Sequence, residues 1–153
     1  LAQIYALEHP ERVRALVLEN SGGLSLPDYS GPSLMPSNRE EARAAFNATI
    51  ARSGSIPDYV VDDFVRRAPT SQVARMAAEP FDRWLLDDRL AELSLPVTLI
   101  WGEEDGVLPL DYAQRLAAAI PGAELRTIPD CGHIPHNECP EEFARELSGA
   151  LGQ

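Results

Sequence analysis

Two segments decide the fold of this chain: PVTLIWGEEDGVLP at residues 96–109 and ELRTIPDCGH at residues 124–133. Each begins with a short run typical of a β-strand and ends in a turn that carries ionisable side chains. Asp105 lies four residues beyond the expected strand end at Trp101, and His133 lies five residues beyond Ile128. Because ligands of open α/β sheets bind outside the carboxyl ends of the strands, we expect both side chains at one edge of the sheet.

A carboxylate beside a histidine has a specific chemical use. When it accepts the Nδ1 proton of the imidazole, it fixes the tautomer and supports the imidazolium that forms when Nε2 takes a proton. The spacing therefore predicts that Asp105 and His133 meet within hydrogen-bonding distance. On residue type alone, Glu103 and Glu104 compete with Asp105 for the acid position.

Strand-like and helix-like segments alternate at both ends of the chain. Such alternation with short loops predicts a parallel sheet flanked by helices, which is an α/β fold. The last helix should begin at Pro140 and bury Phe143, Leu147, Ala150 and Leu151. The expected segments are a helix at 1–9, a strand at 14–18, a strand at 96–101, a helix at 110–120 and a strand at 124–128.

The middle of the chain, residues 24–95, has a different texture. Three prolines break its first part into loop, and four short helices without a strand are expected after it. Ser37 or Asn38 can cap the first helix, and Thr70 or Ser71 can cap the third. The fourth is expected at 81–93. This block is predicted to be an all-helical insertion between two parts of the sheet.

The composition excludes some partners. Thirteen basic and twenty-four acidic residues give a formal charge of −11, which disfavours nucleic acid and anionic membrane surfaces as partners. No apolar run approaches the ~20 residues needed to span a bilayer. Two cysteines are too few for a disulfide framework, so we expect Cys131 and Cys139 to be reduced thiols in a cytoplasmic protein.

The chain resembles the α/β-hydrolase fold family, whose triad follows the order nucleophile, acid, histidine. The segment WGEEDGVLP at 101–109 is similar to the acid turn of that family, and CGH at 131–133 is similar to its histidine loop. Residues 1–13 resemble the helix after the nucleophile elbow and the lead-in to the sixth strand. The resemblance implies three parts: core at 1–23, a helical cap at 24–95 and core again at 96–153.

By this resemblance Asp105 is the acid and His133 the base of a serine-type hydrolase. No G-x-S-x-G is present and the first residue is Leu1, so the nucleophile is expected a few residues upstream of the given sequence. We expect a carboxylic ester or a related acyl or C–C bond of a small apolar molecule as the substrate, with no cofactor or metal. The chain alone is expected to be inactive, and its oligomeric state is left open.

Several alternatives remain at this point. An epoxide hydrolase or haloalkane dehalogenase would use an aspartate nucleophile, with Tyr29 or Tyr59 in the cap, and an inert fragment or binding module would need no catalysis. The pattern CGHIPHNEC at 131–139 has the residue types of a zinc site, although structural zinc usually takes two separated ligand pairs. Residues 84–86 either line a substrate pocket or pack the cap on the sheet.

Overall fold

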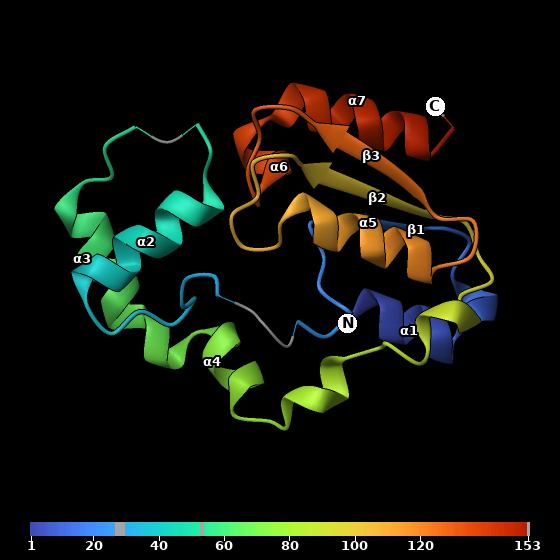
Figure 1. Ribbon diagram of the computed structural model, residues 1–153, viewed down its shortest axis with the longest axis horizontal. Helices are drawn as coiled ribbons and strands as arrows, with labels where there is room; N and C mark the ends of the chain where they lie inside the picture. The colour runs from blue at the N-terminus through green and yellow to red at the C-terminus, as the bar shows by residue number, and fades with distance from the viewer. Residues whose placement is uncertain (27–29, 53, 153) are drawn as a thin grey trace.

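A computed structural model describes residues 1–26, 30–52 and 54–152. Its centre is a sheet of three parallel strands, β1 (Leu16–Glu19), β2 (Val97–Gly102) and β3 (Glu124–Ile128), in the spatial order β1-β2-β3 (Figure 1). The prediction of a parallel sheet flanked by helices is confirmed. Because the three strands run in one direction, the loops that follow them open at the same edge of the sheet.

Helices connect and cover these strands. The helix α1 (Ala2–Glu8) precedes β1, and α5 (Leu110–Ala119) connects β2 to β3. The last two helices are α6 (Pro135–Glu138) and α7 (Pro140–Ala150). In Figure 1, α5 lies on one face of the sheet and α7 on the other. The sheet is therefore covered on both faces, as parallel sheets generally are.

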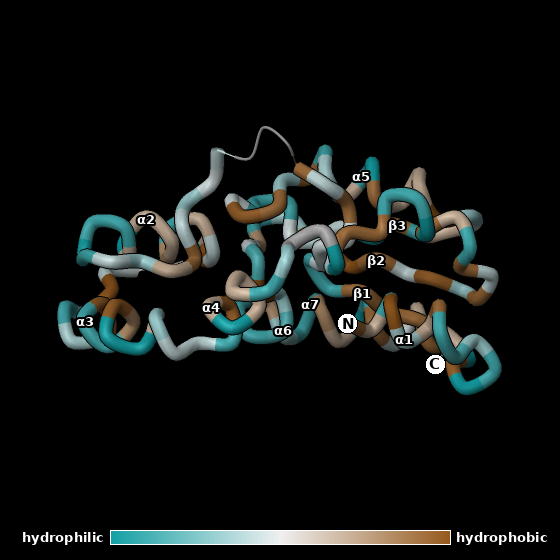
Figure 2. Tube along the Cα trace, turned by 90° about the horizontal axis from the view of Figure 1, so that it is seen from below, coloured by the Kyte–Doolittle hydropathy of each residue, from teal (hydrophilic) through white to brown (hydrophobic). Residues whose placement is uncertain are grey.

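The central strand β2 carries most of the core. All six of its residues are buried, and the tube in Figure 2 is apolar along much of this strand. Successive side chains of a strand point to opposite faces. Accordingly, Leu99 and Trp101 pack in the cluster that includes Leu116 of α5, whereas Ile100 packs with Phe143 of α7.

Among its described residues, the middle of the chain contains three α-helices and no strand. They are α2 (Arg39–Thr49), α3 (Asp58–Arg67) and α4 (Gln72–Ala77), and α2 and α3 lie side by side at the end of the molecule away from the sheet (Figures 1 and 2). The Asn38 side chain caps α2 by accepting from Glu41 N at 3.0 Å, and Ser71 caps α4 by accepting from Ala74 N at 3.1 Å. The remaining helical turns are of the 3₁₀ type: Pro10–Arg12, Ala68–Thr70, Phe81–Trp84 and Leu90–Glu92.

The structure corrects three expectations about individual elements. The helix predicted over 81–93 is wrong, because the N–H of Leu86 donates to the carbonyl of Gly23 at 2.7 Å instead of bonding within a helix. Leu151 is 52% exposed and is not part of the buried face of α7. The short helix α6 was not expected, since its four residues carry no periodic apolar pattern. In the described part of the chain, no helix is both long and apolar enough to cross a membrane.

Candidate active site

Asp105 lies in the turn after β2, and its side chain is completely buried. Four donors surround the carboxylate. Its Oδ1 accepts the backbone N–H groups of Val107 at 2.8 Å and Leu108 at 2.9 Å. Its Oδ2 accepts from Asn20 Nδ2 at 2.6 Å and faces His133 Nδ1 at 2.8 Å. A carboxylate accepts hydrogen bonds through both oxygens, so this environment holds Asp105 in one fixed orientation.

The predicted meeting of Asp105 and His133 is confirmed as geometry. With Asp105 ionised, Nδ1–H of His133 donates to Oδ2, which leaves Nε2 as the unprotonated nitrogen of the neutral ring. The His133 side chain is 25% exposed and lies on the wall of a cavity. The competing acids lie elsewhere: Glu103 and Glu104 are exposed, and Glu103 Oε1 accepts from Thr127 Oγ1 at 2.6 Å.

Asn20 is a third member of this cluster, and the sequence analysis missed it. Its Nδ2 donates to Asp105, and its Oδ1 accepts the N–H of Gly102 at 3.2 Å. Asn20 is 5% exposed and has φ of 34°, a left-handed conformation that asparagine adopts more readily than most residues. A polar residue directly after a buried parallel strand, at the same sheet edge as Asp105 and His133, was the signal that marked it.

Two glycines allow close backbone contacts around the acid and histidine loops. A Cβ on Gly102 would lie 2.1 Å from the carbonyl oxygen of Gly132, and a Cβ on Gly132 would lie 2.6 Å from the carbonyl oxygen of Thr49. Real Cβ atoms are not found at such distances. Gly102 therefore allows the backbone of the acid loop to approach the histidine loop, which brings Asp105 and His133 together, whereas Gly132 allows the end of α2 to approach the histidine loop.

The C-terminal end of α2 binds both loops. The carbonyl of Ala48 accepts from Gly106 N at 2.9 Å, and the carbonyl of Thr49 accepts from His133 N at 2.8 Å. The last carbonyls of a helix lack partners within the helix, so these two loops satisfy them. Glu138 adds a further link, because it accepts from Gly132 N at 3.0 Å and from Arg52 N. The helical block between β1 and β2 therefore contacts the site directly.

The expectation of two reduced thiols is wrong, because Cys131 and Cys139 form a disulfide. The turn of α6 brings their Cα atoms to 6.2 Å, a separation that a disulfide can span. With both cysteines in a disulfide, the cysteine content no longer favours the cytoplasm, and the location of the protein stays a prediction. The disulfide also removes both sulfurs as possible zinc ligands. The Nδ1 atom of His136 lies 2.8 Å from Oε1 of Glu19, so His136 pairs with that carboxylate and not with His133. Among the described residues, no group of three or more potential metal ligands converges.

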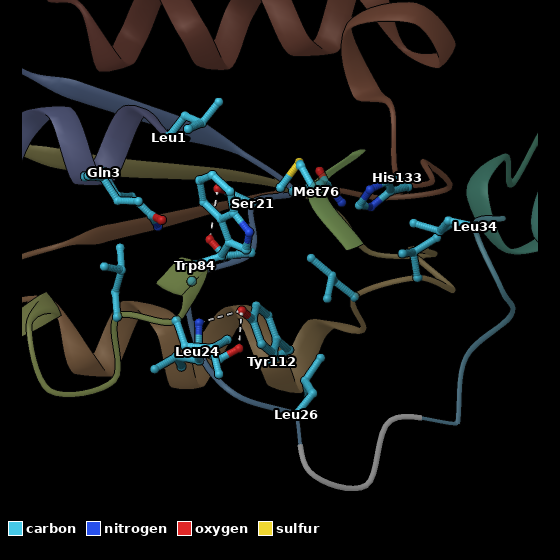
Figure 3. Close-up of a pocket in the computed structure, with 18 of the residues that line it drawn as sticks. Leu1, Gln3, Ser21, Leu24, Leu26, Leu34, Met76, Trp84, Tyr112 and His133 are labelled. Carbon is cyan, nitrogen blue, oxygen red and sulfur yellow. Dashed lines mark hydrogen bonds between the residues drawn. The ribbon is translucent and has the colours of Figure 1, made fainter. Parts of the chain in front are cut away.

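A cavity of about 510 Å³ lies beside His133 (Figure 3). Its lining joins the N-terminal helix, the loop after β1, the middle block and the acid turn. Trp84, Leu85 and Leu86 are part of this lining, and Leu86 also belongs to the core, so both readings of this segment hold in part. The cavity is lined by Leu1, Gln3, Ile4, Asn20, Ser21, Gly22, Gly23, Leu24, Leu26, Pro32, Ser33, Leu34, Met76, Trp84, Leu85, Leu86, Val107, Leu108, Tyr112 and His133.

The hydroxyl of Tyr112 closes one part of this wall. It accepts from Leu24 N at 2.8 Å and donates to the Leu24 carbonyl at 3.2 Å. Burial raises the pKa of Tyr112 above its ordinary value, because the phenolate would be poorly solvated there. The tyrosines considered for epoxide opening give no support: Tyr59 is 74% exposed and is not among the lining residues, and Tyr29 lies outside the described residues.

Comparison with known proteins agrees with this geometry. The chain is 31% identical over 166 residues to a 2-hydroxymuconate semialdehyde hydrolase of Pseudomonas putida, with 100% of this chain and 59% of that protein covered. It is 29% identical over 172 residues to a 2-hydroxy-6-oxononadienedioate/2-hydroxy-6-oxononatrienedioate hydrolase of Cupriavidus pinatubonensis, covering 99% and 58%. The chain thus spans less than two thirds of the length of these relatives.

The solved structures give the same result for the fold. A meta-cleavage product hydrolase from Pseudomonas fluorescens IP01 superposes with a TM-score of 0.74 at 23% identity, covering 99% of this chain and 60% of that one. The sequence profile described as the Alpha/beta hydrolase family matches residues 2–146, which is nearly the whole chain. With its parallel sheet and its acid and histidine loops at one sheet edge, this chain belongs to the α/β-hydrolase family.

Proposed function

We propose that this chain carries the acid and the base of a hydrolase that cleaves a carboxylic ester or a related acyl or C–C bond of a small apolar substrate. The observation that carries the proposal is the hydrogen bond between Asp105 and His133 on the wall of a cavity of about 510 Å³. A cavity of this size suits a small molecule. The names of the relatives, which are hydrolases of 2-hydroxy-6-oxo compounds, support C–C cleavage as one form of this reaction.

His133 acts as the general base and then as the general acid. Its Nε2 takes the proton of a nucleophile hydroxyl as that oxygen adds to the substrate carbonyl, and it returns the proton to the leaving group. In the second half, Nε2 takes a proton from the water that attacks the acyl carbon, and it returns this proton to the nucleophile oxygen as the bond between that oxygen and the acyl group breaks. Asp105 holds the ring and stabilises the imidazolium in both halves, because its Oδ2 lies 2.8 Å from Nδ1.

The nucleophile and the oxyanion-hole donors belong, in this proposal, to sequence upstream of Leu1. Residues 24–95 form the cap over the cavity, and residues 1–23 and 96–153 form the core. Several cavity-lining residues come from the cap, so we expect the cap to determine which substrates bind. In the first alternative, an aspartate at the upstream nucleophile position would make this the site of an epoxide hydrolase or a haloalkane dehalogenase. In the second, the protein is a binding module that holds its ligand without turnover.

The test uses His133→Ala and Asp105→Asn in the complete gene product that contains these residues. Activity is followed with p-nitrophenyl butyrate for the ester bond and with 1-phenylbutane-1,3-dione for the C–C bond, both of them small uncharged molecules. We expect each variant to lower kcat by at least ~10³-fold, as loss of a member of such a triad does. His136→Ala is the matched control, because His136 also faces a carboxylate but is 57% exposed. Full activity of His133→Ala would refute the proposal.

The chain of residues 1–153 is tested in the same assays. With no nucleophile and no oxyanion donors, it is expected to give no hydrolysis above the buffer rate. Turnover by this polypeptide that His133→Ala abolishes would mean that a nucleophile lies within the 153 residues.

A further inference from the structure

Two buried hydrogen-bond donors lie in the wall of the cavity without an acceptor. Gln3 is 4% exposed, and among the residues that the structure describes no partner lies within reach of its Nε2. The Nε1 atom of Trp84 is also buried, and it has no hydrogen-bond partner among the described residues. Both side chains line the cavity, and Figure 3 shows Gln3 at the end away from His133, with its amide group directed toward the cavity. Buried donors without partners are rare in folded proteins, because each loses its hydration without replacement.

The two donors belong to one wall. The amide of Gln3 packs against Gly23 so closely that a Cβ there would lie 2.9 Å from Gln3 Oε1. The carbonyl of Gly23 accepts from Leu86 N at 2.7 Å, which fixes the segment that contains Trp84 to the same glycine. The guanidinium of Arg83 lies 5.1 Å from the centre of the Trp84 ring and helps to hold the indole in place.

The chemistry of the lining residues limits which chemical groups of a ligand can bind there. A buried N–H requires an acceptor, so the matching ligand group carries an oxygen with free lone pairs. No Asp, Glu, Lys or Arg side chain is among the described residues of the lining. Without a cation to neutralise it, a carboxylate would lose its hydration at a large cost in this wall. An uncharged acceptor, such as a ketone, ester or amide carbonyl, does not incur that cost.

We propose that Gln3, at the end of the cavity away from His133, and Trp84 form a polar subsite that binds an uncharged carbonyl oxygen of the substrate. The inference rests on the proposed function in taking this cavity as the substrate site, and it adds the class of group that orients the substrate. The carbonyl that reacts lies near His133, and the second oxygen is held by the two N–H groups. A substrate with oxygens at both ends is therefore preferred over one with a purely apolar tail.

Binding is measured in the complete gene product with three probes of matched size: 1-phenylbutan-1-one, butylbenzene and 4-phenylbutanoate. The readout is the indole N–H signal of Trp84 in ¹H–¹⁵N spectra, assigned by its disappearance in Trp84→Phe. We expect the ketone to bind about 10-fold more tightly than the hydrocarbon and to shift this signal downfield. The signal of Trp101, whose Nε1 already donates to the Leu108 carbonyl at 2.9 Å, reports that the fold is intact.

Gln3→Leu and Trp84→Phe remove one donor each and leave an apolar side chain of similar size in its place. Each is expected to weaken ketone binding by about 5- to 10-fold and to leave butylbenzene binding unchanged. Equal affinities of ketone and hydrocarbon in the unaltered protein, with the Trp84 signal unmoved, would overturn the subsite. Tighter binding of the carboxylate than of the ketone would overturn the assignment to an uncharged group.

The two proposals fail separately. His133→Ala should abolish turnover without changing the preference for the ketone, since binding needs no proton transfer. Retained ketone preference in an enzyme that has no hydrolase activity would support the subsite and refute the proposed reaction. Hydrolysis with no ketone preference would do the reverse.

Discussion

At the scale of single residues, the site is an arrangement of donors around one buried carboxylate. Asp105 has no water-exposed side-chain surface, so the protein itself supplies the hydrogen bonds that water would give. Asn20 supplies the shortest of these at 2.6 Å and is anchored in turn by the N–H of Gly102. Asn20 is therefore a positioning residue: it acts on His133 through the orientation of Asp105.

Replacing Asn20 tests this role. Asn20→Ala removes a hydrogen bond to a charged group, and we expect kcat to fall by about 10- to 100-fold. Asn20→Asp should be more harmful, because it places a second carboxylate against Oδ2 of Asp105. Asn47→Ala, on the exposed surface of α2, is the control. The measurement is the dependence of kcat on pH in the complete gene product. An unchanged profile in Asn20→Asp would contradict the assignment.

At the scale of elements, the helical block is joined to the acid loop and to the histidine loop by backbone hydrogen bonds. The final carbonyls of α2 accept from Gly106 in the acid loop and from His133 in the histidine loop. Glu138 of α6 connects Gly132 with Arg52, just beyond α2. The position of His133 therefore depends on how α2 is seated, as well as on the sheet.

Glu138 allows this dependence to be measured. Glu138→Ala removes both acceptors, leaves the N–H of Gly132 without its partner, and should lower kcat by about 10-fold through misplacement of His133. Glu138→Gln keeps one amide oxygen and should restore most of the activity. Glu141→Ala changes an exposed glutamate of α7 and should have no effect. If Glu138→Gln is as impaired as Glu138→Ala, a single acceptor oxygen at this position does not hold His133 in place.

At the scale of the whole molecule, α5 and the middle block are held together across the cavity wall by Tyr112 and Leu24. Burial is the main cause of the raised pKa of Tyr112, the carboxylate of Asp87 adds to it, and the backbone of Leu24 and the guanidinium of Arg115 oppose it. The folded protein therefore keeps the phenol proton at a pH where the unfolded chain has begun to lose it. Stability should fall as pH rises above about 10, since the unfolded state then binds fewer protons than the folded state.

This alkaline loss is measured as the free energy of unfolding by urea from pH 8 to pH 11. Tyr112→Phe should be less stable at pH 8, by about 1 kcal/mol for the lost hydrogen bonds, and should lose part of the decline above pH 10. Tyr59→Phe, at a residue that is 74% exposed, should keep the full decline. A decline of the same size in Tyr112→Phe would show that other groups cause it.

The sequence by itself determined the fold class and the acid–histidine pair. Apolar runs such as those at residues 14–18 and 96–101 indicate burial on their own, and side chains directly after parallel strands meet at one edge whatever the rest of the fold is. The spacing placed the acid turn and the histidine loop at one edge, and the resemblance of residues 101–109 to the acid turn of the family selected Asp105 over Glu103 and Glu104. Asp105 and His133 lie within hydrogen-bonding distance, as expected.

Only the tertiary structure decided the features that depend on contacts between distant segments. Asn20 joins Asp105 across 85 residues, and Leu86 loses its helix because Gly23, far away in sequence, accepts its N–H. The disulfide between Cys131 and Cys139 depends on the short helix α6, which the hydrophobic pattern of the sequence did not predict. The local sequence pattern determines which secondary structure a segment favours. The partner of a hydrogen-bond donor or of a thiol, in contrast, depends on which distant segment packs against that group in the folded chain.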